Sequence, residues 1–441
     1  MTRRDVVLLI LILLLGAGIT TAHKVRQGFL PHGVRVEGLE FLRGPLHTFS
    51  ETADAPWSDG DRVIVEAQHS DVQILTWGEN KVHVELKKQL HGEKEEEAAR
   101  QAADVKLSVV PSPGTVTIGT TGSRLSGLSS EFTVTIPEHS RLQVIADNGS
   151  VVVHGIQADV LVKTAHGDVE ASDLAGSLEV VNEDGSINLH RIKGPVNLRT
   201  AHGDIEAGDL GGTADVACED GDVSLSRVAG AVKVTHAHGD IGISEVGGEV
   251  HLTTGNSDVT ASDIRGNLEI IGEHGSIRVE RAEADLKITA PHCEIWVENL
   301  AGALTATAES DPFTATRVKG GVKVEVSASS VTLTDVQGRI EVSGTHTPVQ
   351  ITRPGADVEV STTNQEIEIA SPAARGFRVD ARAEQGEVES DIEELHVPED
   401  RPGHFAGSTG DGRIRYRLKT SHATISILKT ASDSADAEED R

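Results

Sequence analysis

Hydrophobic and polar positions along the chain repeat with a period of 18 residues. Around each recurring apolar position, apolar and polar residues alternate, which is typical of a β-strand with one face toward water. Each unit of 18 residues is therefore expected to contain two short strands. The most regular apolar column contains Val151, Val169, Ile187, Ile205, Val223, Ile241, Val259, Ile277, Ile295, Phe313, Val331, Val349 and Ile367.

Two columns of glycine mark the turns between these strands. Glycine suits such turns because it adopts positive φ without a steric penalty, and we expect this role for the first column. The first column contains Gly149, Gly167, Gly185, Gly203, Gly221, Gly239 and Gly275. The second contains Gly176, Gly194, Gly212, Gly230, Gly248, Gly266, Gly302, Gly320 and Gly338.

This pattern predicts an all-β fold, a single-stranded parallel β-helix, or β-solenoid, with 18-residue coils. A unit of this size without a helix cannot bury its apolar face alone, so successive units must stack. Right-handed winding is the default expectation. A β-sandwich is disfavoured because the turn signals never drift in phase. Twelve steps of the repeat, from Gly149 to Gln365, predict a rod roughly 58 Å long at the usual strand spacing.

The remaining segments flank this array. Residues 1–22 are expected to form a hydrophobic helix that acts as a signal anchor or signal peptide, because "VVLLILILLLGAGITTA" follows two arginines. We then expect a linker over 23–60 and an N-terminal β region over 61–135, with a short helical insert near 93–105. The regular solenoid spans 136–375, irregular final coils span 376–430, and 431–441 form an acidic disordered tail.

Charge and composition limit the choice of partners and location. The chain has 69 acidic and 40 basic residues, a formal net charge of -29, and only 2% aromatic residues. Nucleic acid would be repelled, and large cofactor pockets usually need more aromatic side chains. We therefore expect no nucleic-acid partner, no cofactor and membrane contact only through the N-terminal segment. The basic residues before that segment place the rest of the chain in the cell envelope, outside the cytoplasm.

Two columns of polar residues suggest that the true unit contains two coils, or 36 residues. Opposite charges on neighbouring strands stabilise a sheet by roughly 0.2–1 kcal/mol per pair, whereas stacked like charges destabilise it. The favoured interpretation is thus a structural ladder. The column before the first glycine contains Asn148, His166, Asp184, His202, Asp220, His238, Asn256, His274 and His292. The second column contains Asp173, Arg191, Asp209, Arg227 and Glu245.

The alternative interpretation of the histidine column is a divalent-metal site, because alternating imidazole and carboxylate groups are suitable zinc ligands. The best local cluster is His202, Asp220, His236 and His238, with the two last histidines expected on one strand face. Catalysis is disfavoured, since the acids are spread evenly and the coils carry no insertion that could frame a cleft.

The two cysteines, Cys218 and Cys293, are four coils apart. At the usual strand spacing their axial separation is about 19 Å, which is too long for a disulfide within one chain. We expect two unpaired thiols, while a disulfide between two molecules stays open.

Several segments in order resemble the bacterial putative-adhesin β-helix family, a domain of unknown function. They are "VEAQHSDVQILTW", the Glu/Ala-rich insert, "FTVTIPEHSRLQVIADNGSVVV", "GRIRYRL" and "ATISIL". The resemblance implies an exported or membrane-anchored protein without established enzymatic activity, and it supplies no catalytic residues.

The sequence thus predicts a non-enzymatic envelope or surface protein that acts as an adhesin or binding scaffold for a protein or polymer ligand. A scaffold that self-assembles or senses the envelope is the alternative. A carbohydrate-active enzyme is the least favoured of the three.

Overall fold

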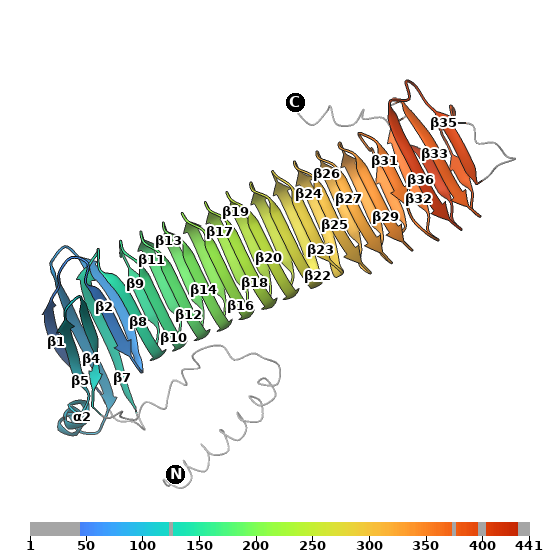
Figure 1. The fold of residues 1–441 in the computed structure, drawn as a ribbon. Helices are drawn as coiled ribbons and strands as arrows, with labels where there is room; N and C mark the ends of the chain where they lie inside the picture. Colours follow the sequence, from blue (N-terminus) through green and yellow to red (C-terminus); the bar gives the residue numbers. More distant parts are fainter. Residues whose placement is uncertain (1–44, 123–126, 373–375, 396–402, 431–441) are drawn as a thin grey trace, which may run out of the picture.

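The computed structural model describes residues 45–122, 127–372, 376–395 and 403–430. It is a long, straight rod of stacked coils with a cap at each end (Figure 1). The predicted all-β solenoid with 18-residue coils is confirmed, since strands 18 residues apart pair in parallel, for example Val160 with Leu178 and Val169 with Ile187. Each coil contributes one strand to each of two stacks.

The first strand stack runs along one side of the rod. Its members are β8 (Arg141–Asn148), β10 (Val160–His166), β12 (Leu178–Asp184), β14 (Val196–His202), β16 (Ala214–Asp220), β18 (Val232–His238), β20 (Val250–Asn256), the first half of β22 (Leu268–Ala282), β23 (Leu286–Ala290), β25 (Leu304–Glu309), β27 (Val322–Ser327), β29 (Ile340–Thr345) and β31 (Val358–Ser361).

The second strand stack forms the other side. Its members are β9 (Val151–His154), β11 (Val169–Leu174), β13 (Ile187–Ile192), β15 (Ile205–Leu210), β17 (Val223–Val228), β19 (Ile241–Val246), β21 (Val259–Ile264), the second half of β22, β24 (His292–Leu300), β26 (Phe313–Val318), β28 (Val331–Val336), β30 (Val349–Thr352) and β32 (Ile367–Pro372).

The core is one continuous column of aliphatic side chains between the two stacks. Inward residues such as Val169, Leu178 and Val180 are at most 1% exposed. Small and large side chains alternate along the axis, with Ala171 stacked on Leu189. The expected period-two alternation is therefore present, and no coil could bury its apolar side without its neighbours.

We call the turn from the first stack to the second the first corner. Glycine is required there because φ is positive and the coils approach closely. At Gly203, φ is +135°, and a Cβ atom would lie 2.3 Å from the carbonyl oxygen of Gly185. After Gly275 the turn changes, since positive φ moves to Ser310, Ala328 and two later residues. The glycine column consequently ends there.

The turn back to the first stack, the second corner, requires glycine for a different reason. A Cβ atom on Gly194 would lie 2.2 Å from the carbonyl oxygen of Gly176, although φ is not in the left-handed region. Close backbone approach alone excludes other side chains at this column.

The N-terminal cap closes one end with antiparallel strands. It contains β1 (Leu46–Pro56), β2 (Arg62–Ala67), β3 (Ser70–Trp77), β4 (Lys81–His91), α2 (Glu95–Ala102), β5 (Lys106–Ser112), β6 (Thr115–Thr121) and β7 (Leu128–Pro137). Buried Lys88 joins these parts, because its Nζ atom donates to Glu51 Oε1 at 2.6 Å and to the carbonyl oxygen of Val105 at 2.7 Å.

The C-terminal cap closes the other end. It contains β33 (Phe377–Glu384), β34 (Val388–Ser390), β35 (His404–Ser408), β36 (Ile414–Ser421) and β37 (Ile425–Thr430). The rings of Phe377 and Tyr416 stack with centroids 4.6 Å apart, so aromatic groups fill the end of the aliphatic core.

Several expectations about segments can now be compared with the structure. The predicted linker over 23–60 is wrong for residues 46–56, because β1 pairs with β4 along its whole length. Helix α2 lies within the predicted insert near 93–105. The hydrophobic helix expected at 1–22 and the tail at 431–441 lie outside the described residues. Within the described ranges, no helix has the length and apolar character needed to cross a membrane.

The close approach at the first corner gives a direct test. We expect Gly203→Ala to lower the free energy of unfolding by roughly 1–3 kcal/mol, because it combines positive φ with a clash against Gly185. Gly242→Ala is the matched control, since a Cβ atom there meets nothing within 4 Å. Chemical denaturation of both variants measures the difference, and equal stabilities would contradict the account.

Candidate functional site

The histidine and aspartate column at the first corner forms a continuous ladder of ion pairs. His166 Nδ1 lies 2.8 Å from Asp184, which also lies 3.0 Å from His202 Nδ1. In the same way Asp220 lies between His202, at 3.4 Å, and His238, at 3.0 Å. These side chains are about half exposed. The predicted structural ladder is thus confirmed, since each carboxylate separates two imidazoles.

The proposed zinc cluster is only partly assembled. His236 lies inside the rod at 4% exposure, with Nε2 2.7 Å from the carbonyl oxygen of Gly221 and Nδ1 2.9 Å from Ser257 Oγ. His238 is exposed, so the expectation that both histidines share one strand face is wrong. The chain bends into the corner between them, and this bend turns His238 outward.

The structure therefore brings together His202, Asp220 and His238 but not His236. In the described parts of the chain, no three His, Cys, Asp or Glu side chains are arranged to hold a metal ion. Zinc binding stays a prediction, and it now concerns only the exposed ladder.

The cysteines are free and buried, and Cys293 lies in β24 rather than in an exposed turn. Burial raises the pKa of both thiols to about 11. At neutral pH they are protonated and poorly reactive, so neither resembles a catalytic nucleophile.

The second corner carries a longer ladder of charged residues, all in the left-handed conformation with φ of 53–59°. This backbone conformation is unfavourable for residues other than glycine. Sequence analysis identified the first five members, and the same spacing of 18 would have found the rest. The full column contains Asp173, Arg191, Asp209, Arg227, Glu245, Asp263, Arg281, Asn299, Arg317, Asp335 and Arg353.

Within this second-corner ladder, each arginine binds the residue of the preceding coil. Arg191 donates to both oxygens of Asp173, at 2.6 and 2.7 Å. Arg227 binds Asp209 in the same bidentate manner. These hydrogen bonds hold the pKa of each aspartate below its ordinary value. Two-point contact with a carboxylate is the strongest geometry available to a guanidinium group.

The alternation breaks at Glu245. The next coil offers Asp263 in place of an arginine, and Arg281 already binds both oxygens of Asp263, at 2.7 and 2.8 Å. Glu245 makes no ion pair within 4.0 Å to any residue that the structure describes. The ladder thus contains one acid whose equivalents all have a partner on the following coil.

A groove of about 590 Å³ lies beside this break. It extends over five coil steps, or roughly 24 Å at the usual strand spacing. Apolar residues Val228, Val246 and Ala282 lie along it, and the second-corner ladder forms one wall. Charged residues of the opposite wall are Arg265, Glu283 and Lys319. None of these three makes an ion pair within 4.0 Å in the described ranges.

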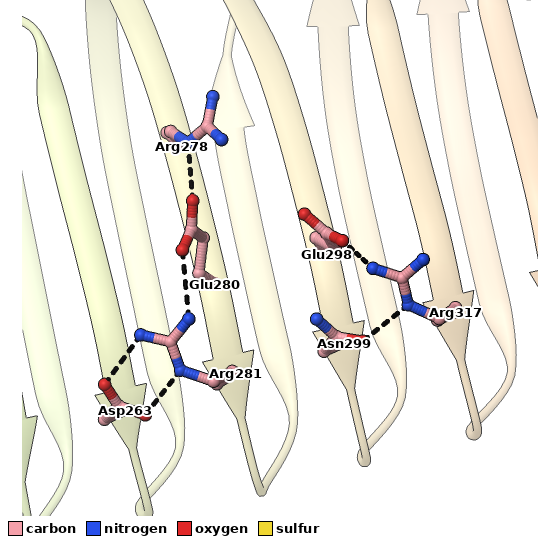
Figure 2. A network of polar contacts seen from close by, with 7 residues as sticks. All are labelled: Asp263, Arg278, Glu280, Arg281, Glu298, Asn299 and Arg317. Atoms are coloured by element: carbon pink, nitrogen blue, oxygen red, sulfur yellow. Dashed lines mark hydrogen bonds and ion pairs between the residues drawn. The ribbon is translucent and has the colours of Figure 1, made fainter. Parts of the chain in front are cut away.

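A network of polar contacts fixes the ladder wall of this groove (Figure 2). Arg281 also contacts Glu280 at 3.1 Å, and Glu280 accepts from Arg278 Nε at 2.7 Å. The guanidinium group of Arg278 lies 3.8 Å from the ring centroid of Trp296. Further along, Arg317 joins Asn299 and Glu298. The wall is thus held by contacts across several coils.

The position of His236 leads to a first prediction for this site. We expect His236→Ala to lower the free energy of unfolding by roughly 1–3 kcal/mol, because buried hydrogen-bond partners lose their contacts. The exposed His238→Ala serves as control and should change stability little. Zinc titration by calorimetry should give the same result for His236→Ala and the unchanged chain. Loss of a zinc signal in His236→Ala alone would contradict this assignment.

A second prediction concerns pH. Hydrogen bonds from Arg281 lower the pKa of Asp263 below 3.8. A carboxylate of this kind stabilises the fold above its ordinary pKa, and the contribution is lost as pH falls through the lowered pKa. In Arg281→Gln, NMR titration should show the Asp263 pKa returning toward 3.8, while that of Asp173 stays low. An unchanged Asp263 pKa would refute the pairing.

Comparison with known proteins places the chain in a family. Residues 61–249 match the Toastrack DUF4097 family. No curated protein matches the chain. A "putative cell adhesion protein" of Clostridium sporogenes is similar to it over 87% of this chain and 100% of its own, with 7% identity and a TM-score of 0.18.

Two further solved structures are similar. A "putative adhesin" of Bacteroides fragilis has 13% identity, covers 69% of this chain and 97% of its own, and has a TM-score of 0.18. A "putative adhesin" of Parabacteroides merdae has 12% identity, covers 68% and 95%, and has a TM-score of 0.19. Scores this low carry no argument about function. The family match confirms the resemblance seen in the sequence, and over residues 61–249 the chain belongs to the Toastrack DUF4097 family, a domain of unknown function.

Proposed function

We propose that the protein is a non-enzymatic binding scaffold of the cell envelope or surface, of the adhesin type, whose side faces bind a protein or polymer ligand. The observation that carries this proposal is the combination of a rigid rod and one elongated groove on it. Elsewhere along both corners, charged side chains are engaged with one another in ladders. At the groove, acids and bases without ion-pair partners face solvent.

The rod's rigidity supports a binding role. Each coil is hydrogen-bonded to the next along both strand stacks, as in the contacts from Gly167 to Asp184 and from Val196 to Thr213. A stack of this kind, roughly 60 Å long at the usual strand spacing, holds its outer side chains in fixed positions. A long ligand can thus contact many coils without the rod having to rearrange.

The caps favour binding along the side of the rod over assembly end to end. The outer strands β1 and β35 are antiparallel to their neighbours β4 and β33, so the parallel stacks do not continue to the ends. Such terminal units usually prevent further stacking. Two expectations from the sequence remain part of the proposal: right-handed winding, and anchoring in the envelope through the N-terminal segment.

Adhesion of coated particles tests the proposal. We expect beads carrying the full-length chain to bind bacterial cells or arrayed envelope polysaccharides and peptides, and the soluble chain to compete with them. Beads carrying an unrelated protein of similar net charge are the control, because they measure nonspecific electrostatic binding. Turnover of any arrayed polysaccharide, or binding equal to that of the control beads, would contradict the proposal.

A further inference from the structure

We propose that Glu245 and the second-corner groove bind an arginine side chain carried by an extended segment of a partner protein. The inference deepens the proposed binding function, because it names the class of ligand and the residue that receives it. It rests on the one position at which the second-corner ladder does not satisfy itself.

The ladder itself shows which group its acids bind. Asp173, Asp209 and Asp263 each accept two hydrogen bonds from the guanidinium group of an arginine on the next coil. Asp335 is bound in the same way by Arg353, and even the amide oxygen of Asn299 accepts from Arg317 at 2.7 Å. Equivalent positions in one chain thus bind one chemical group, always from the same side.

Glu245 occupies the same corner position and has the same left-handed backbone, with φ of 56°. The neighbours that could neutralise it are already engaged. Arg227 on the preceding coil binds Asp209, and Arg281, two coils further on, binds Asp263. The carboxylate of Glu245 is therefore directed to a place that a guanidinium group fills elsewhere, and the groove adjoins it.

The groove provides room for more than one side chain. It is elongated along the rod, which suits an extended segment better than a compact ligand. Small residues at Ala229, Gly247 and Ala301 leave space along the wall opposite the ladder. On that wall Arg265 and Lys319 fit carboxylates of the segment, and Glu283 fits a second base. We therefore infer a segment with both basic and acidic side chains.

The chemistry favours arginine over the alternatives. A planar guanidinium group matches a carboxylate at two points, whereas an ammonium group makes a point contact. A purely acidic polymer would be repelled by a rod with a formal charge of -29. A polysaccharide bearing amino groups is a different class of ligand, and the experiment below separates it from a peptide.

The test uses an array of extended peptides in which a central arginine is flanked by glutamate, with matched peptides carrying lysine or glutamine instead. Chitosan oligosaccharides provide the amine-bearing polysaccharide. We expect the full-length chain to bind arginine peptides at least tenfold more tightly than their glutamine counterparts. Equal binding of arginine and glutamine peptides, or binding of chitosan alone, would overturn the inference.

Two variants locate the binding. Glu245→Gln should weaken the arginine peptides at least tenfold, because charged hydrogen bonds are lost. Asp263→Arg should also abolish binding, since it places on the next coil the arginine that Glu245 lacks, while Arg281 keeps its contact with Glu280. Asp173→Asn is the matched control, because it removes a ladder acid far from the groove, and peptide binding should not change.

The variants also separate this inference from the proposed function. If Glu245→Gln remains folded and coated beads still adhere to cells with full strength, the binding scaffold stands and the arginine site is refuted. If the unchanged chain shows no adhesion at all but still binds arginine peptides, the site stands and the adhesive function fails. Circular dichroism melting curves confirm that each variant is folded.

Discussion

The close approach of successive coils at their corners is the constraint on which the rest of the structure depends. At Gly185 a Cβ atom would lie 2.4 Å from the carbonyl oxygen of Gly167, and at Gly194 it would lie 2.2 Å from that of Gly176. Contacts this short leave no room for an extra residue or side chain at these columns. They keep the coils at one length and in one register, so each residue stacks on its counterpart 18 positions away.

Stacking equal positions creates an electrostatic problem at the corners, because identical charges would repel at strand spacing. The chain answers with a unit of two coils. At the first corner, imidazoles separate carboxylates, as in the sequence His166, Asp184, His202. At the second corner, guanidinium groups neutralise carboxylates in bidentate pairs. The same constraint explains why one irregular rung, Glu245 followed by Asp263, leaves a charge exposed beside a groove.

The family assignment and the groove concern largely different parts of the rod. The Toastrack DUF4097 match ends at residue 249, and the second-corner ladder breaks at Glu245. Most residues that line the groove, including Arg265, Glu283 and Lys319, lie beyond the matched segment. The family therefore explains the kind of fold, while the binding proposal depends on the contacts of the later coils.

The sequence alone determined the features that follow from periodicity: the 18-residue coil, two strands per coil, the inward columns, and the separation of Cys218 from Cys293. It also contained the run from Glu245 to Asp263, but not the fact that Arg281 binds both oxygens of Asp263. Only the tertiary structure placed His236 inside the rod and strand β1 in the cap. Periodic positions must stack on one another whatever the details, whereas the bend of a strand at a corner and the pairing of non-repeating cap strands depend on contacts between distant parts of the chain.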